Sequence, residues 1–129
     1  MTKYKILAYI IGVSQLVLGT IYLFAPQFFI AWQGLSEIGQ DINYPLAMLA
    51  GRFLVYGVGM FVIAADPVKN KFWADGMIAI QAIDLAAGLF YTFTGVVALA
   101  DSMIPMIDAA IFMIGLLVLR GATLEKSEK

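Results

Sequence analysis

The sequence predicts an all-α integral membrane protein, a four-helix transmembrane bundle folded as a single domain over residues 1–129. Hydrophobic residues make up 62% of the chain and charged residues 13%, whereas soluble proteins have about 45–50% and about 25%. Four apolar runs approach the roughly 20 residues that a helix needs to cross a bilayer. They lack the strict alternation of barrel strands, so they indicate helices with internally bonded backbones. The predicted spans are residues 6–25, 45–65, 72–93 and 103–120.

The first span, ILAYIIGVSQLVLGTIYLFA, follows two lysines, Lys3 and Lys5. We expect a retained transmembrane helix and not a cleaved signal peptide, because the apolar stretch is long and no Ala-x-Ala-like site follows it. Pro26 marks the end of this span. The next segment, PQFFIAW over residues 26–32, is amphipathic enough to form a short helix at the membrane interface.

The second and third spans are joined by the short segment DPVKNK, which predicts an antiparallel pair of neighbouring helices. The fourth span is expected to begin with an N-cap at Asp101 and Ser102, followed by Pro105 in the first helical turn. Pairs of small residues four apart, such as Ala8 and Gly12, favour close helix packing in a membrane.

The positions of lysine and arginine predict the orientation of the bundle. The first and third connections contain no Lys or Arg and carry only the acidic residues Glu37, Asp41 and Asp101. The positive-inside rule then places both termini in the cytoplasm, and we expect a bacterial or archaeal cytoplasmic membrane. The basic residues on the cytoplasmic side are Lys3, Lys5, Lys69, Lys71, Arg120, Lys126 and Lys129.

Polar residues inside the spans are predicted to share one level of the membrane and to form a ligand-binding site. At 1.5 Å per residue, Arg52 lies about 10 Å below the outer end of its span, Asp84 about 13 Å and Asp108 about 8–9 Å. A charged side chain in a bilayer costs about 2.5–3.5 kcal/mol or more, so these three are expected to face the bundle interior. The other candidate binding residues in this layer are Gln15, Tyr56 and Gln81.

Arg52 and Asp84 are expected to pair across neighbouring helices, with the guanidinium donating bidentately to the carboxylate. Two interpretations of the pair stay open: a structural ion pair that fixes helix register, or part of a pocket for a ligand or proton. Three stay open for Asp108. It completes an Arg–Asp–Asp cluster, takes up a proton, or reaches toward the surface from the N-terminal part of its helix.

Several function classes are excluded by composition. The chain has no cysteine and no histidine, which excludes disulfides, thiol redox chemistry, zinc and iron–sulfur sites, and histidine acid–base catalysis. The net charge of −1 argues against nucleic acid as a partner, because phosphate binding needs a basic surface. We expect no metal site, no catalytic residue and no cofactor.

The stretch LGTIYLFAPQFF, followed by AGRFLVYGVGMFVIAADP and a compact hairpin of two further spans, resembles the DoxX-like superfamily of small four-helix membrane proteins. Arg52, Gly57 and Gly59 match its loose pattern of an arginine within the second span and glycines one or two turns on. The resemblance covers nearly the whole chain. It implies a role in a quinone-related oxidoreductase complex or as a membrane accessory protein, without a thiol-linked redox step because cysteine is absent.

The predicted function is that of an accessory or structural subunit that packs against a larger membrane complex, such as a redox or energy-converting one. The alternative is a binding or transport module whose Arg- and Asp-lined pocket takes a lipid, a quinone or a small anion. An enzyme using Asp84 or Asp108 as general acid–base ranks last, because the sequence supplies no nucleophile. Expected partners are the lipid bilayer, other membrane proteins or further copies of this chain.

Overall fold

The computed structural model describes residues 2–36 and 39–129, which form helices joined by short turns, with no β-strand among them. Four helices are long and apolar enough to cross a membrane, which confirms the predicted all-α fold with four candidate spans. Glu37, one of the acidic residues of the first connection, lies outside the described residues. The elements are α1 (Thr2–Phe24), α2 (Pro26–Trp32), the 3₁₀ helix η1 (Gln40–Ile42), α3 (Asn43–Ala65), α4 (Lys71–Phe93) and α5 (Leu99–Ser127).

All four long helices begin before the predicted spans, and α5, which also ends later, differs most from the prediction. It begins at Leu99, so the predicted N-cap at Asp101 and Ser102 is wrong. The Ser102 hydroxyl is bonded instead to the Thr92 hydroxyl of α4, at 2.7 Å, and lies inside the helix. Pro105 therefore falls in the second turn, where its missing N–H leaves the Asp101 carbonyl without the usual helical donor.

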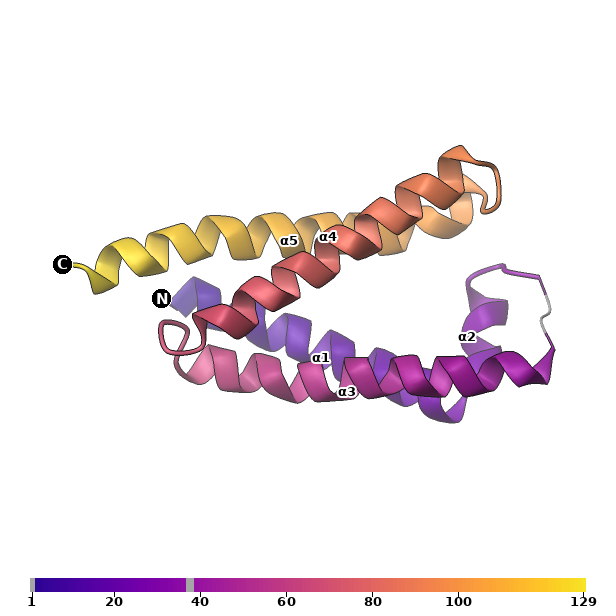
Figure 1. The fold of residues 1–129 in the computed structure, drawn as a ribbon, viewed down its shortest axis with the longest axis horizontal. Helices are drawn as coiled ribbons and strands as arrows, with labels where there is room; N and C mark the ends of the chain where they lie inside the picture. The colour runs from indigo at the N-terminus through magenta and orange to yellow at the C-terminus, as the bar shows by residue number, and fades with distance from the viewer. Residues whose placement is uncertain (1, 37–38) are drawn as a thin grey trace.

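The four long helices form two antiparallel pairs, α1 with α3 and α4 with α5 (Figure 1). The two pairs converge at one end of the molecule and separate toward the other. We call the first the closed end; it contains both chain termini and the turn over residues 66–70 between α3 and α4. The second, the open end, contains α2 and the turn over residues 94–98 between α4 and α5.

Glycine residues let the backbones of α1 and α3 approach each other closely. A Cβ atom on Gly12 would lie 3.0 Å from the Gly57 carbonyl oxygen, and one on Gly57 would lie 2.7 Å from Cγ of Leu16. Ala8, one turn before Gly12, is fully buried, so the close packing predicted from this pair is confirmed. Such contacts hold helices together in lipid, where burial from water contributes nothing between them.

The side chains of the closed end form the packed core of the molecule. All four long helices contribute to it, so both pairs are joined at this end. The largest fully buried side chains in this core are Ile11, Met60, Ile63, Met77 and Leu116.

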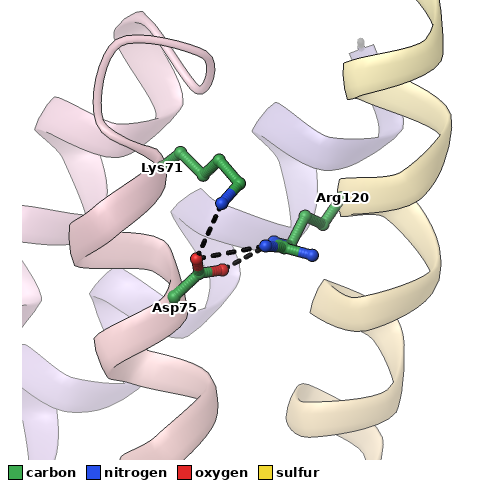
Figure 2. A network of polar contacts seen from close by, with 3 residues as sticks. All are labelled: Lys71, Asp75 and Arg120. Atoms are coloured by element: carbon green, nitrogen blue, oxygen red, sulfur yellow. Dashed lines mark hydrogen bonds and ion pairs between the residues drawn. The ribbon is translucent and has the colours of Figure 1, made fainter.

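An ion-pair network lies at the closed end and joins α4 to α5 (Figure 2). Nη2 of Arg120 donates a hydrogen bond to Oδ2 of Asp75 at 3.2 Å. Nε of Arg120 lies 2.6 Å from Oδ1, but its N–H is not aligned for a hydrogen bond, so this contact is an ion pair. Lys71, one turn earlier on α4, also donates to Oδ2 at 3.2 Å. The Asp75 carboxylate is thus held from two helices at once.

The outer surface of the bundle is apolar on every long helix. Val55 of α3 is 73% exposed, Ile83 of α4 66% and Val118 of α5 65%. An apolar surface of this extent is unfavourable in water but is what a lipid bilayer solvates. Apolar residues of the chain therefore cover the outer surface of the bundle as well as filling its core.

Candidate functional site

A cavity of about 690 Å³ lies between the two helix pairs at the open end. Residues of α1, α2, α3, α4 and α5 line it, together with the turn that follows α2. Most of its lining is apolar, but five of the six predicted binding residues reach it. These five are Gln15, Arg52, Gln81, Asp84 and Asp108.

The predicted ion pair between α3 and α4 is present on the cavity wall. Nη2 of Arg52 donates to Oδ2 of Asp84 at 3.4 Å, and the two side chains are 35% and 38% exposed. The contact is single, so the predicted bidentate geometry is wrong. The physical reason is spacing: α3 and α4 touch far less than α1 and α3 do, and only one terminal nitrogen reaches the carboxylate.

The rest of the Arg52 guanidinium is engaged differently. Its Cζ lies 4.8 Å from the centroid of the Phe53 ring, which stabilises the cation through the ring face. Its Nε is buried and has no hydrogen-bond partner among the described residues. The guanidinium therefore keeps donor capacity beyond the bond to Asp84.

Two buried amides lie where the closed-end core gives way to the cavity. Gln15 follows Ile11 by one turn of α1, and Gln81 follows Met77 by one turn of α4; the two glutamines are only 5% and 4% exposed. Nε2 of Gln81 donates to the thioether sulfur of Met77 at 3.3 Å, a weak acceptor. No hydrogen bond joins the Gln15 side chain to another described residue. The Gln15 amide atoms are not among the fully buried unpartnered atoms of the described residues, so they open onto the cavity, where a bound group can hydrogen-bond to them.

Asp108 lines the cavity from α5 but stands apart from Arg52 and Asp84. Its side chain is exposed, and no ion pair or hydrogen bond joins its carboxylate to another part of the described chain. The Arg–Asp–Asp cluster is therefore not formed, and the other two interpretations of Asp108 stay open. Asp101, seven residues earlier, lines the same cavity and was not predicted as a site residue. Seven residues are two helical turns, a spacing that would have placed both carboxylates on one face.

Tyr56, the sixth predicted residue, does not line the cavity. It packs against the closed-end core, and its hydroxyl oxygen lies 2.6 Å from where a Cβ atom on Gly76 would stand. Because Tyr56 lies one turn closer to the α3–α4 turn than Arg52, it meets α4 where the two helices are still close. Its placement is that of a packing residue.

One wall of the cavity consists of aromatic rings that sequence reasoning did not select. Tyr22 stacks on Phe53 with centroids 5.6 Å apart and an interplanar angle of 12°. Phe29 lies 4.8 Å from Tyr22 and 5.6 Å from Trp32, measured between ring centroids. All four rings line the cavity. Tyr22 lies seven residues, or two helical turns, after Gln15 on α1. This spacing could have placed Tyr22 on the same helix face as Gln15.

The mouth of the cavity is bounded by α2 and the turn after it. The predicted short helix over residues 26–32 is present, and Nε2 of Gln27 donates to Oδ1 of Asn43 at 2.7 Å, which ties it to the start of α3. Gly34 has a φ angle of 75°, a conformation that favours glycine. A Cβ atom on Gly34 would stand 2.8 Å from Oδ1 of Asp101. The turn after α2 thus reaches the beginning of α5 across the cavity mouth.

Comparison of the chain with protein-family models, with curated proteins and with solved structures finds no match. The resemblance to the DoxX-like superfamily therefore stays a prediction that rests on the residues quoted above. The function has to be inferred from the cavity and the side chains that line it.

Proposed function

We propose that this protein is a small membrane-embedded binding module whose cavity takes up a mostly apolar ligand with one polar group. The observation that carries the proposal is a cavity of about 690 Å³ with a buried, unpartnered amide, Gln15, in its lining. Pockets for small molecules have volumes of about 300–1,000 Å³, apolar walls and a few convergent polar groups. The cavity at the open end has each of these properties.

The polar residues of the cavity support this function over a purely structural one. A structural ion pair needs its partners satisfied, as Asp75 is by Arg120 and Lys71. At the cavity, by contrast, Asp84 has a single contact of 3.4 Å and Gln15 has no hydrogen-bond partner among the described residues. Polar groups kept inside a membrane bundle at a cost mark paths or sites for ligands.

The predicted accessory-subunit role and the predicted partner proteins stay predictions. The apolar outer surface suits lipid and a protein partner equally, so it favours neither. We also propose the predicted orientation, with both termini in the cytoplasm of a bacterial or archaeal cell. Seven basic residues lie near the closed end and the connections of the open end have none, so the cavity would face the outer side of the membrane.

The test uses the full chain in phosphatidylcholine vesicles and a short, neutral alkanol that carries a photoreactive diazirine. After illumination, mass spectrometry of peptides measures labelling of cavity residues relative to lipid-facing residues. We expect preferential labelling of peptides that contain Phe29 and Phe53, which line the cavity.

A matched pair of variants on α1 separates the cavity from the lipid-facing surface. Leu18 lines the cavity, whereas Leu23 is 40% exposed on the outside of the same helix. Leu18→Trp should lower cavity labelling about fivefold, the effect of roughly 1 kcal/mol of lost contact energy, and Leu23→Trp should leave it unchanged. Labelling that follows lipid exposure alone and ignores Leu18→Trp would refute the binding function.

A further inference from the structure

The charges in the cavity are unbalanced. Its lining contains one guanidinium, Arg52, against three carboxylates, those of Asp84, Asp101 and Asp108. Arg52 pairs with Asp84, while the carboxylates of Asp101 and Asp108 have no ion pair or hydrogen bond within the described part of the chain. Both aspartates lie on one face of α5, so the excess negative charge lies at the cavity. An anionic ligand would meet repulsion there, and a cationic ligand attraction.

The aromatic wall opposite these carboxylates also favours a cation. Ring faces attract cations through their quadrupole, most strongly where water is excluded. Tyr22, Phe29, Trp32 and Phe53 present a continuous set of ring contacts to the cavity. The Arg52 guanidinium, 4.8 Å from the Phe53 centroid, is already an organic cation held in this way.

The two buried glutamines leave amide oxygens at the cavity without a donor from the described chain. The Gln15 side chain is nine-tenths buried, lines the cavity and has no hydrogen bond to a described residue. The carbonyl oxygen of Gln81 likewise accepts no hydrogen bond from the described chain, because its only bond is the one its Nε2 donates to Met77. Both oxygens can accept from the N–H groups of a ligand.

The distribution of the carboxylates argues for a large cation. Among residues 2–36 and 39–129, no three acidic side chains stand close enough together to hold a metal ion. The cavity is far larger than a single ion and is lined mainly by apolar atoms. A bulky apolar group carrying one positive charge fits both properties.

We propose that the cavity binds an apolar organic cation, such as a protonated alkylamine, whose ammonium group lies at Asp108 while its apolar part contacts the aromatic wall. This inference rests on the proposed binding function and narrows the ligand class to cations. Asp101, at the mouth, attracts the same charge as the ligand enters.

The experiment compares two diazirine probes of equal chain length in the same vesicles, one an alkylamine and the other the neutral alkanol. Lipid-facing labelling at Leu23 corrects for unequal partitioning into the bilayer. The amine should label cavity residues about tenfold more than the alkanol, as expected for one hydrogen-bonded charge pair.

Variants that each change a single carboxylate test which aspartate attracts the ammonium group. Asp108→Asn should remove most of the tenfold preference for the amine over the alkanol, both measured in the same variant, and Asp108→Glu should keep the preference. Asp101→Asn should have a smaller effect. Asp41→Asn is the control, because Asp41 lies at the same side of the bundle and does not line the cavity.

The outcomes separate this inference from the proposed function. If the alkanol fails to label the cavity, the binding function itself is wrong. If the alkanol labels and the amine shows no preference, or a carboxylate probe is preferred, the cation inference is wrong and the binding function stands. An unchanged preference in Asp108→Asn, or failure of Asp108→Glu to keep the preference, would likewise overturn the role assigned to Asp108.

Discussion

The closed and open ends of the bundle are made by the same four helices but use polar residues in opposite ways. At the closed end, Asp75 is held by both Arg120 and Lys71, beside a core of fully buried side chains. At the open end, Asp84 has a single contact of 3.4 Å, and Gln15 has no partner among the described residues. The difference supports the proposed division, in which the closed end provides stability and the open end binds a ligand.

The largest effect is expected from the core of the closed end. Leu116 of α5 is fully buried, whereas its neighbour Leu117 is 47% exposed on the outside. Leu116→Ala should lower the free energy of unfolding by about 2–5 kcal/mol through lost contacts and the cavity left behind. Leu117→Ala should change it by less than about 0.5 kcal/mol. Denaturant titration in detergent micelles measures both, and equal losses would contradict a stability centred on this core.

Double-mutant cycles on the two arginine–aspartate pairs are expected to give intermediate effects. The Arg120–Asp75 pair has two contacts and the Arg52–Asp84 pair one, of 3.4 Å, so the first pair should be coupled more strongly. Replacement by leucine should yield a coupling energy of about 1 kcal/mol for the first pair and about half of that for the second. Arg52→Leu alone should destabilise the fold, and adding Asp84→Leu should recover much of the loss.

A larger coupling energy for the Arg52–Asp84 pair than for the Arg120–Asp75 pair would contradict this difference between the two ends. Purely additive effects of Arg52→Leu and Asp84→Leu would mean that these two side chains do not interact in the membrane.

The smallest effect is expected at Gln15. Because its amide has no partner in the described chain, Gln15→Leu should leave the free energy of unfolding unchanged within about 0.5 kcal/mol, or raise it. The same titration measures it, with Gln81→Leu as the control that also loses a weak bond to Met77. A loss above about 1 kcal/mol would indicate that Gln15 stabilises the closed end and is not free for a ligand.

The sequence predicted the helices and the level of the polar residues well, because both follow from counting along apolar runs. Residue counting at a fixed rise placed Gln15, Arg52, Asp84 and Asp108 at similar depth, and all four line one cavity. It did not predict the rotation of each helix about its axis. The spans are apolar nearly all round, so no hydrophobic face indicates which side turns inward.

The wrong predictions have two causes: the rotation of each helix about its axis was unknown, and contacts between distant segments leave no local pattern. Tyr56 shares a helix face with Arg52 but belongs to the core, because its ring packs against α4 at Gly76 instead of reaching the cavity. The aromatic wall depends on α2 packing back against α1 and α3, which no local pattern specifies. The start of α5 was misplaced because the Ser102 hydroxyl, taken for a cap, bonds to the Ala98 carbonyl and to Thr92 of α4 inside a helix that has already begun.

Pro105 interrupts the backbone ladder of α5 between the two free carboxylates of the cavity. The turn that carries Asp101 is consequently attached to the remainder of α5 by one hydrogen bond fewer than a regular helix would provide. Its bond from Ser102 to Thr92 makes up for this by fastening it to α4 instead. The first turn of α5, with Asp101 at the cavity, is therefore positioned by a contact between two hydroxyl groups on neighbouring helices as well as by its own backbone.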